Sequence, residues 1–317
     1  MKNFLQMGKR FFLFVAVNLL VMVTLYLVLS VVLHFFPQLA GRRGSGNWLG
    51  YLAVYSLIFG MGGAFISLAI SRMMAKWMMG VQVIDPGTHD PEARELVRMV
   101  HGYAQRAGLP AMPEVGIYDS PEVNAFATGP SKSRSLVAVS SGLLHQMNRT
   151  ETEGVIAHEI AHIANGDMVT MTLVQGIINA FVMFLSRVLA FLAAQALGGN
   201  RSNDDDRQSV GNSLIEMVLG IVFQILFTLL GSIVVAWFSR QREFRADAGG
   251  MLLAGKAQMI GALRGLQRIY DPQLAAEGSN SGFQAFKISG QSGGFMALFS
   301  THPPIEERIA YLENLGR

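Results

Sequence analysis

The chain has 317 residues, of which 51% are hydrophobic and only 15% charged, against roughly 25% charged residues in soluble domains. This deficit of charge indicates a membrane protein. The length is sufficient for about two domains. Because it has no cysteine, the chain can form neither disulfides nor a cysteine-ligated metal site. The net charge of +3 is too small to indicate a nucleic-acid partner, and no basic run is interleaved with aromatic residues.

Two apolar segments near the N-terminus are long enough to cross a bilayer, which takes about 20 apolar residues. The first covers residues 11–36 without a charge, too long for a signal peptide, and is predicted to stay in the protein as a span. The second lies within residues 43–72. Its three glycines would allow close contact between membrane helices or simply reflect the glycine content of such helices: Gly60, Gly62 and Gly63.

Two further apolar segments, residues 168–197 and 217–239, are joined by the short polar stretch GGNRSNDDDRQSVGN. They are predicted to form a membrane hairpin. With the first pair, this gives four transmembrane helices.

The polar segment between the second and third spans has a residue pattern typical of a folded α+β domain. Residues 90–109 show helical periodicity, and residues 113–144 alternate like short strands joined by turns. A second helix begins near Thr150-x-x-Glu153, a capping-box pattern. The stretch after the fourth span is strongly helical as well, and a short helix opened by prolines ends the chain.

The predicted organisation has four parts. Residues 1–72 form two transmembrane helices, residues 73–166 the first part of a catalytic domain, residues 167–239 the hairpin and residues 240–317 the second catalytic part. Lys and Arg are concentrated at the N-terminus and after the second and fourth spans, so both termini and the hydrophilic parts are predicted to be cytoplasmic.

Residues 154–167, GVIAHEIAHIANGD, contain His158, Glu159 and His162 in the pattern His-Glu-x-x-His. On a helix, side chains four apart project from one face, so the two imidazoles can bind one metal ion. Glu159 then lies beside the metal, where it can take a proton from a bound water. The pattern predicts a zinc peptidase centre.

A catalytic zinc site needs a third protein ligand and an open position. Asn165 and Met168 stand where a metzincin would have Gly and His, so the ligand must come from further along the chain. The candidates are Glu243, Asp247 and His302. Glu243 and Asp247 share a helix face, which suits one ligand and one carboxylate that holds a ligating histidine; alternatively, both pair with neighbouring arginines. The hairpin favours the first reading, because it returns the chain to the side of the membrane that it left.

HEIAH, a membrane hairpin and then Glu243-x-x-x-Asp247 resemble the HtpX membrane metalloproteases, relatives of the Ste24 prenyl proteases within the gluzincins. The likeness extends to NAFATG at residues 124–129 and to THPPIEERI near the C-terminus. It implies a gluzincin-type fold with His158, His162 and Glu243 as zinc ligands. Glu159 would be the general base, and Asp247 would orient a ligand.

The resemblance also implies an endopeptidase of the bacterial inner membrane, which cleaves damaged or misfolded membrane proteins in stress quality control and cooperates with other membrane proteases. His302 or Arg308 would stabilise the oxyanion of the reaction, although both have ordinary structural alternatives.

Asn124, Ala125 and Phe126 are predicted to form an edge strand that binds extended substrate, with an ordinary turn as the alternative. The Gly/Ser-rich residues 277–294 are either a flap over the cleft or a loop.

Two other functions are compatible with the spans and the metal motif. One is a metal-binding membrane transporter, which the scarcity of ionisable residues inside the spans disfavours. The other is a catalytically silent scaffold, which has no use for a base at Glu159.

Overall fold

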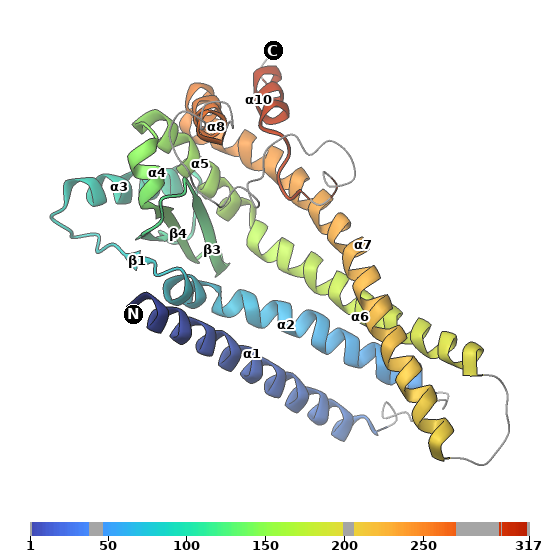
Figure 1. The fold of residues 1–317 in the computed structure, drawn as a ribbon. Helices are drawn as coiled ribbons and strands as arrows, with labels where there is room; N and C mark the ends of the chain where they lie inside the picture. Colours follow the sequence, from blue (N-terminus) through green and yellow to red (C-terminus); the bar gives the residue numbers. More distant parts are fainter. Residues whose placement is uncertain (1, 38–46, 199–205, 271–297, 299, 316–317) are drawn as a thin grey trace. The chain divides into compact units, whose positions relative to one another are not determined.

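The computed structural model describes residues 2–37, 47–198, 206–270, 298 and 300–315 (Figure 1). Its residues form two compact units, each built from two separate stretches of the chain. The first unit comprises Met1–Ser67 and Thr172–Val235, and the second comprises Leu68–Met171 and Ala236–Arg317.

The first unit consists of long apolar helices. They are α1 (Lys2–Phe35), α2 (Trp48–Met78), most of α6 (Asp167–Gly198) and the first part of α7 (Asp206–Ala254). Many of their large apolar side chains are exposed, such as Leu20 at 66% and Ile225 at 58%. An apolar surface of this extent is expected to face lipid rather than water.

Three of the described helices are long and apolar enough to cross a membrane: Trp48–Met78, Asp167–Leu197 and Ser213–Ala254. In α1 the described apolar stretch, Leu19–Phe35, is shorter. All four predicted spans are therefore helical, and three of them meet the criterion for a span within the described residues.

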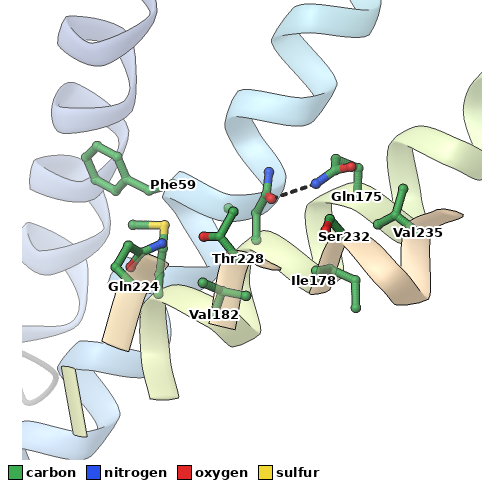
Figure 2. Close-up of a pocket in the computed structure, with 11 residues that line it drawn as sticks. Phe59, Gln175, Ile178, Val182, Gln224, Thr228, Ser232 and Val235 are labelled. Atoms are coloured by element: carbon green, nitrogen blue, oxygen red, sulfur yellow. Dashed lines mark hydrogen bonds between the residues drawn. The ribbon is translucent and has the colours of Figure 1, made fainter. Parts of the chain in front are cut away.

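Glycines bring these helices close together within the first unit. A Cβ atom on Gly60 of α2 would lie 2.3 Å from the backbone nitrogen of Ala180 in α6, and one on Gly231 of α7 would lie 2.6 Å from a methyl carbon of Ile178. Gly62 packs similarly on α1, whereas Gly63 meets nothing within 4 Å. Beside these contacts, α2, α6 and α7 line a cavity of about 230 Å³ (Figure 2).

The second unit contains a four-stranded sheet in the order β1-β2-β4-β3. Its strands are β1 (Gln82–Val83), β2 (Glu114–Tyr118), β3 (Ala125–Ser131) and β4 (Arg134–Ser140). Strands β2 and β4 are parallel, and the other two pairs are antiparallel. Strand β3 therefore lies at an edge, as predicted for its first residues.

Five further helices belong to this unit: α3 (Pro91–Arg106), α4 (Ser141–Gln146), α5 (Arg149–Asn165), α8 (Lys256–Tyr270) and α10 (Ile305–Asn314). Helix α5 contacts α3, α8 and strands β3 and β4. Its side chains Ile156, Ile160 and Ile163 are fully buried, so α5 is the centre of the core. The α+β character predicted for this region is confirmed.

Helix α5 begins with a capping box, two residues earlier than predicted. The Asn148 side chain accepts a hydrogen bond from the Glu151 backbone, and the Glu151 carboxylate accepts one from the Asn148 backbone. The prediction of Thr150 and Glu153 was wrong because Glu151 is held by Arg268 of α8, whereas Glu153 pairs with Arg149 on the surface.

A pair of glycine substitutions tests the contact between α5 and α8. A Cβ on Gly154 would lie 2.3 Å from the backbone oxygen of Gln258, whereas one on Gly261 of α8 would meet nothing within 4 Å. Gly154→Ala should destabilise the protein by about 1–3 kcal/mol through overpacking. Gly261→Ala should stabilise it by up to about 1 kcal/mol through helix propensity. Melting temperatures of the detergent-purified variants measure both effects, and equal shifts in the same direction would contradict this packing.

Candidate metal centre

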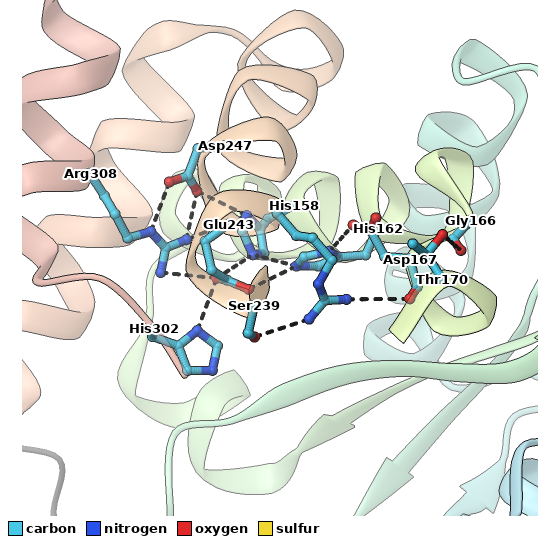
Figure 3. Close-up of polar contacts among 11 residues, drawn as sticks. His158, His162, Gly166, Asp167, Thr170, Ser239, Glu243, Asp247, His302 and Arg308 are labelled. Atoms are coloured by element: carbon cyan, nitrogen blue, oxygen red, sulfur yellow. Dashed lines mark hydrogen bonds and ion pairs between the residues drawn. The ribbon is translucent and has the colours of Figure 1, made fainter. Parts of the chain in front are cut away.

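Helix α5 presents its two histidines to one point (Figure 3). The Nε2 atoms of His158 and His162 lie 3.1 Å apart, and their rings are nearly perpendicular, at 87°. Both side chains are largely buried, at 10% and 12% exposure. The spacing in the sequence therefore produces the predicted convergence of two nitrogen atoms.

The other nitrogen of each imidazole is held by a carboxylate. His158 Nδ1 lies 3.0 Å from Asp247 Oδ1, and His162 Nδ1 lies 2.6 Å from Asp167 Oδ2. If each Nδ1–H donates a hydrogen bond to its carboxylate, the lone pair of Nε2 is available to bind a metal. Such carboxylate–histidine pairs also fix the orientation of the rings.

Two glycines of α7 bring the third candidate ligand to this point. A Cβ on Gly249 would lie 2.8 Å from the Cβ of Ala161, and one on Gly250 would lie 3.2 Å from the backbone nitrogen of His158. Because α7 can approach α5 this closely, Glu243, two turns before the glycines, reaches both histidines. Glu243 Oε2 lies 3.5 Å from His158 Nε2, and Glu243 Oε1 lies 3.4 Å from His162 Nε2.

One donor atom from each of His158, His162 and Glu243 lies within 4.8 Å of the other two, close enough for all three to bind one metal ion. Ligand atoms at about 2.0–2.2 Å from zinc in tetrahedral geometry are separated by about 3.3–3.6 Å. Here the two Nε2 atoms are 3.1 Å apart, Glu243 Oε1 lies 3.4 Å from His162 Nε2, and the other oxygen, Oε2, lies 3.5 Å from His158 Nε2. These residues form a group that could hold a metal ion, the only such group among the described residues.

An orphaned carboxylate oxygen supports the same interpretation. Glu243 is 2% exposed, and its Oε2 accepts no hydrogen bond from the described part of the chain. His302 Nδ1 at 2.9 Å and Arg308 Nη1 at 3.5 Å are near this oxygen but do not have hydrogen-bond geometry. A buried carboxylate oxygen without a donor is costly, and a cation bound there would satisfy it.

The three candidates for the third ligand thus have different places. Glu243 faces both imidazoles, Asp247 holds His158, and His302 contacts Glu243 from a half-exposed position on the segment before α10.

Arg308, from α10, donates two hydrogen bonds to Asp247, 2.6 and 2.8 Å long, and is 7% exposed. Burial alone would lower the pKa of Arg308, but the carboxylates of Asp247 and Glu243 raise it. Its guanidinium is therefore bound to the group that orients His158, and its predicted oxyanion role stays a prediction.

Glu159 follows His158 on α5 and is half-buried. Among the described residues it makes no hydrogen bond or ion pair. Its carboxylate is therefore not committed to a structural partner, as a general base beside the metal requires.

Sequence reasoning missed two residues of the centre, Asp167 and Arg242. Asp167 directly follows Gly166, which ends α5 in the left-handed conformation (φ 74°), and this turn directs its carboxylate back to His162. Arg242 donates to the Asp167 backbone oxygen at 3.4 Å and to Ser239 at 3.1 Å. An acidic residue immediately after the helix-ending glycine was the available signal for Asp167.

The predicted substrate strand begins at the edge of the sheet. Asn124 is exposed, and its backbone exchanges hydrogen bonds with Ser140 at the end of β4. Ala125 and Phe126 open β3 and, within the described residues, pair with β4 on one side only. Strand β3 also contacts α5, the helix that carries the two histidines. The proposed flap at residues 277–294 lies outside the described residues.

The comparisons with known proteins agree on one family. The model of peptidase family M48 matches residues 90–315. Similar proteins include "Protease HtpX homolog" of Bacillus subtilis, 50% identical over 97% of this chain and 99% of its own length, and "Protease HtpX" of Tolumonas auensis, 48% identical over 97% and 99%. The crystal structure of Ste24p from S. mikatae is similar in fold, with a TM-score of 0.59 and 18% identity over 94% of this chain and 64% of that one.

The protonation of His162 gives a test that needs no catalysis. Burial opposes its charged form, but hydrogen bonds to Asp167 and Glu243 raise the pKa of His162 from 6.5 to about 10. The metal-free protein therefore carries this proton at neutral pH, and its stabilising effect is complete below pH 6.5 and lost as the pH rises through about 10. A metal needs the neutral imidazole.

Adding Zn²⁺ to the metal-free protein near neutral pH should therefore release at least one proton per site. Titration calorimetry in two buffers of different ionisation enthalpy measures this number, which should fall toward zero above about pH 10. Asp167→Asn should release fewer protons, because the pKa of His162 falls without the carboxylate. Identical heats in both buffers would contradict the assignment.

Proposed function

The chain belongs to peptidase family M48, as a member of its HtpX proteases, and from this premise we propose that His158, His162 and Glu243 hold one catalytic zinc ion. The chain is thus a membrane metalloprotease, and the transporter left open by the sequence is not favoured. The observation that carries the zinc proposal is the convergence of these three side chains, whose donor atoms lie within 4.8 Å of one another, with the Nδ1 atom of each histidine beside a carboxylate.

When bound, zinc would lower the pKa of a water molecule and polarise the scissile carbonyl. Glu159 accepts the proton of that water as the attack proceeds and passes it to the leaving amine. Asp247 and Asp167 keep the imidazoles in the ligating orientation. Arg308 neutralises Asp247 and thereby positions His158. His302 is the better placed of the two predicted oxyanion donors, because its ring is half-exposed beside Glu243.

The free edge of β3 is proposed to receive the substrate. An extended peptide that pairs with Ala125 and Phe126 would gain main-chain hydrogen bonds, which are independent of the substrate's sequence. Asn124 stands exposed where this edge begins. A protease of this kind suits damaged or misfolded membrane proteins, since unfolded segments share a backbone but not a sequence.

The two compact units are assigned distinct roles in this proposal. The unit of Met1–Ser67 and Thr172–Val235 anchors the protein in the bilayer by four spans, including α1, and the unit of Leu68–Met171 and Ala236–Arg317 carries catalysis. The distribution of Lys and Arg favours the bacterial inner membrane with the catalytic unit in the cytoplasm.

Replacing the Glu159 carboxylate with an amide tests the proposed role of this residue as the general base. Glu159→Gln should lower the cleavage of casein by about 10²–10⁴-fold while bound zinc, measured by elemental analysis, stays unchanged. Glu153→Gln is the matched control, because Glu153 lies on the same helix and pairs with surface Arg149; it should retain activity. Undiminished cleavage by zinc-loaded Glu159→Gln would contradict the assignment of Glu159 as the general base.

A cysteine pair tests the orientation, because the natural chain contains no cysteine. Ser202→Cys, in the polar stretch of the hairpin, should react with a membrane-impermeant maleimide added to intact cells. Ser133→Cys, exposed between β3 and β4, should react only after the inner membrane is permeabilised. The reverse pattern would contradict the proposed topology.

A further inference from the structure

The cavity in the first unit has polar walls, although the helices that form it are apolar. Five uncharged polar side chains contribute to it, two from α6 and three from α7: Gln175, Asn179, Gln224, Thr228 and Ser232. Figure 2 shows these side chains around the cavity together with Phe59 of α2. All five lie within helices long and apolar enough to span a membrane. Polar side chains inside a membrane cost free energy, so their presence there commonly marks a functional site.

The polar side chains do not join the helices to each other. Among the described residues their hydrogen bonds stay within one helix, from Gln175 to Asn179 at 2.8 Å and from Ser232 to the Leu229 backbone at 2.7 Å. The helices are held together by the glycine contacts at Gly60 and Gly231 instead. The carboxamides therefore do not link the helices as polar residues often do in membranes. Gln175 and Asn179 pair with each other, and all three carboxamides, including that of Gln224, line the cavity.

The chemistry of the walls selects an uncharged ligand that both donates and accepts hydrogen bonds. Among the residues that the structure describes, no acidic, basic or histidine side chain lines the cavity, so a phosphate or an ammonium group would lack a counter-charge. The carboxamides of Gln175, Asn179 and Gln224 carry the same donor and acceptor groups as a peptide bond. In a bilayer, an unwound stretch of polypeptide needs partners of this kind, because each exposed backbone group otherwise costs several kcal/mol.

We propose that this cavity binds the exposed peptide backbone of membrane-inserted substrates where their helices have unwound. The proposal rests on the proposed function, since it concerns how a protease of membrane proteins recognises a damaged span. A regular helix satisfies its own backbone groups and gains nothing from the carboxamides. The cavity thus distinguishes broken spans from intact ones by hydrogen bonding, independently of side-chain sequence.

Isosteric substitutions in the full-length protein test the proposal by activity. The substrates are casein and a single-span model polypeptide with a Gly-Pro pair in its apolar segment, both with the protease in liposomes. Gln175→Met and Gln224→Met should lower kcat/KM for the membrane polypeptide about tenfold, the effect of losing one or two hydrogen bonds, mainly through KM. Casein cleavage should not change. Gln195→Met, on α6 outside the cavity, should leave both substrates unaffected.

A cross-linking experiment tests binding without catalysis. A benzophenone amino acid at Ile178, which lines the cavity, should cross-link the membrane polypeptide in the Glu159→Gln background, and Gln224→Met should suppress the product. The same probe at Ile177, which is 56% exposed and does not line the cavity, should cross-link it much less. Equal yields at the two positions, cross-links to lipid alone, or parallel loss of casein and membrane cleavage in Gln175→Met would overturn the proposal. If the unaltered protein showed no metal-dependent cleavage of either substrate, the proposed function itself would be refuted.

Discussion

Helices α5 and α7 touch backbone to backbone at Gly249 and Gly250, where a single methyl group on either residue would collide with α5 or with Met259. This contact sets the distance between Glu243 and the two histidines of α5. Everything else in the centre follows from it: Asp247 lies one turn beyond Glu243 and reaches His158, and Arg308 of α10 binds Asp247. The close approach of the two helices therefore brings together the three proposed ligands and Asp247, which is proposed to orient one of them.

The charges buried at this contact explain how the site can exist before a metal enters. Glu243 and Asp247 are at most 2% exposed, and a buried carboxylate without a counter-charge would be strongly destabilising. Neighbouring carboxylates raise the pKa of His158 and raise that of His162 to about 10, so His162 carries a proton in the metal-free protein at neutral pH. A metal ion and this proton therefore compete for His162, so the affinity of the site for metal depends on pH.

The first unit meets a different constraint, because its surroundings are apolar and its polar groups cannot rely on water. Its helices pack through glycines, and the uncharged polar side chains are left to line one cavity. Neutral carboxamides suit this environment better than charged groups, since they are less costly to bury and still discriminate between satisfied and unsatisfied backbone. The second unit thus buries charged side chains at the proposed metal centre, whereas the first unit, which is proposed to lie in lipid, lines its cavity with uncharged polar side chains.

The sequence alone was enough to predict the apolar helices, the strands of the second unit, the metal motif on α5 and the family. Each of these depends only on local spacing or on a short motif. Hydrophobic run length and the four-residue separation of His158 and His162 act within one helix and need no knowledge of the rest. Spacing alone left the third ligand open among Glu243, Asp247 and His302, since these lie 81 or more residues beyond His162 in the chain. Only the tertiary structure decided that Glu243 faces both imidazoles, that Asp167 holds His162 and that Arg308 holds Asp247. It also gathered Gln175 and Gln224, on two different helices, into one cavity. These pairings depend on the close approach of separate helices, and no local pattern in a single sequence encodes which helix faces will meet.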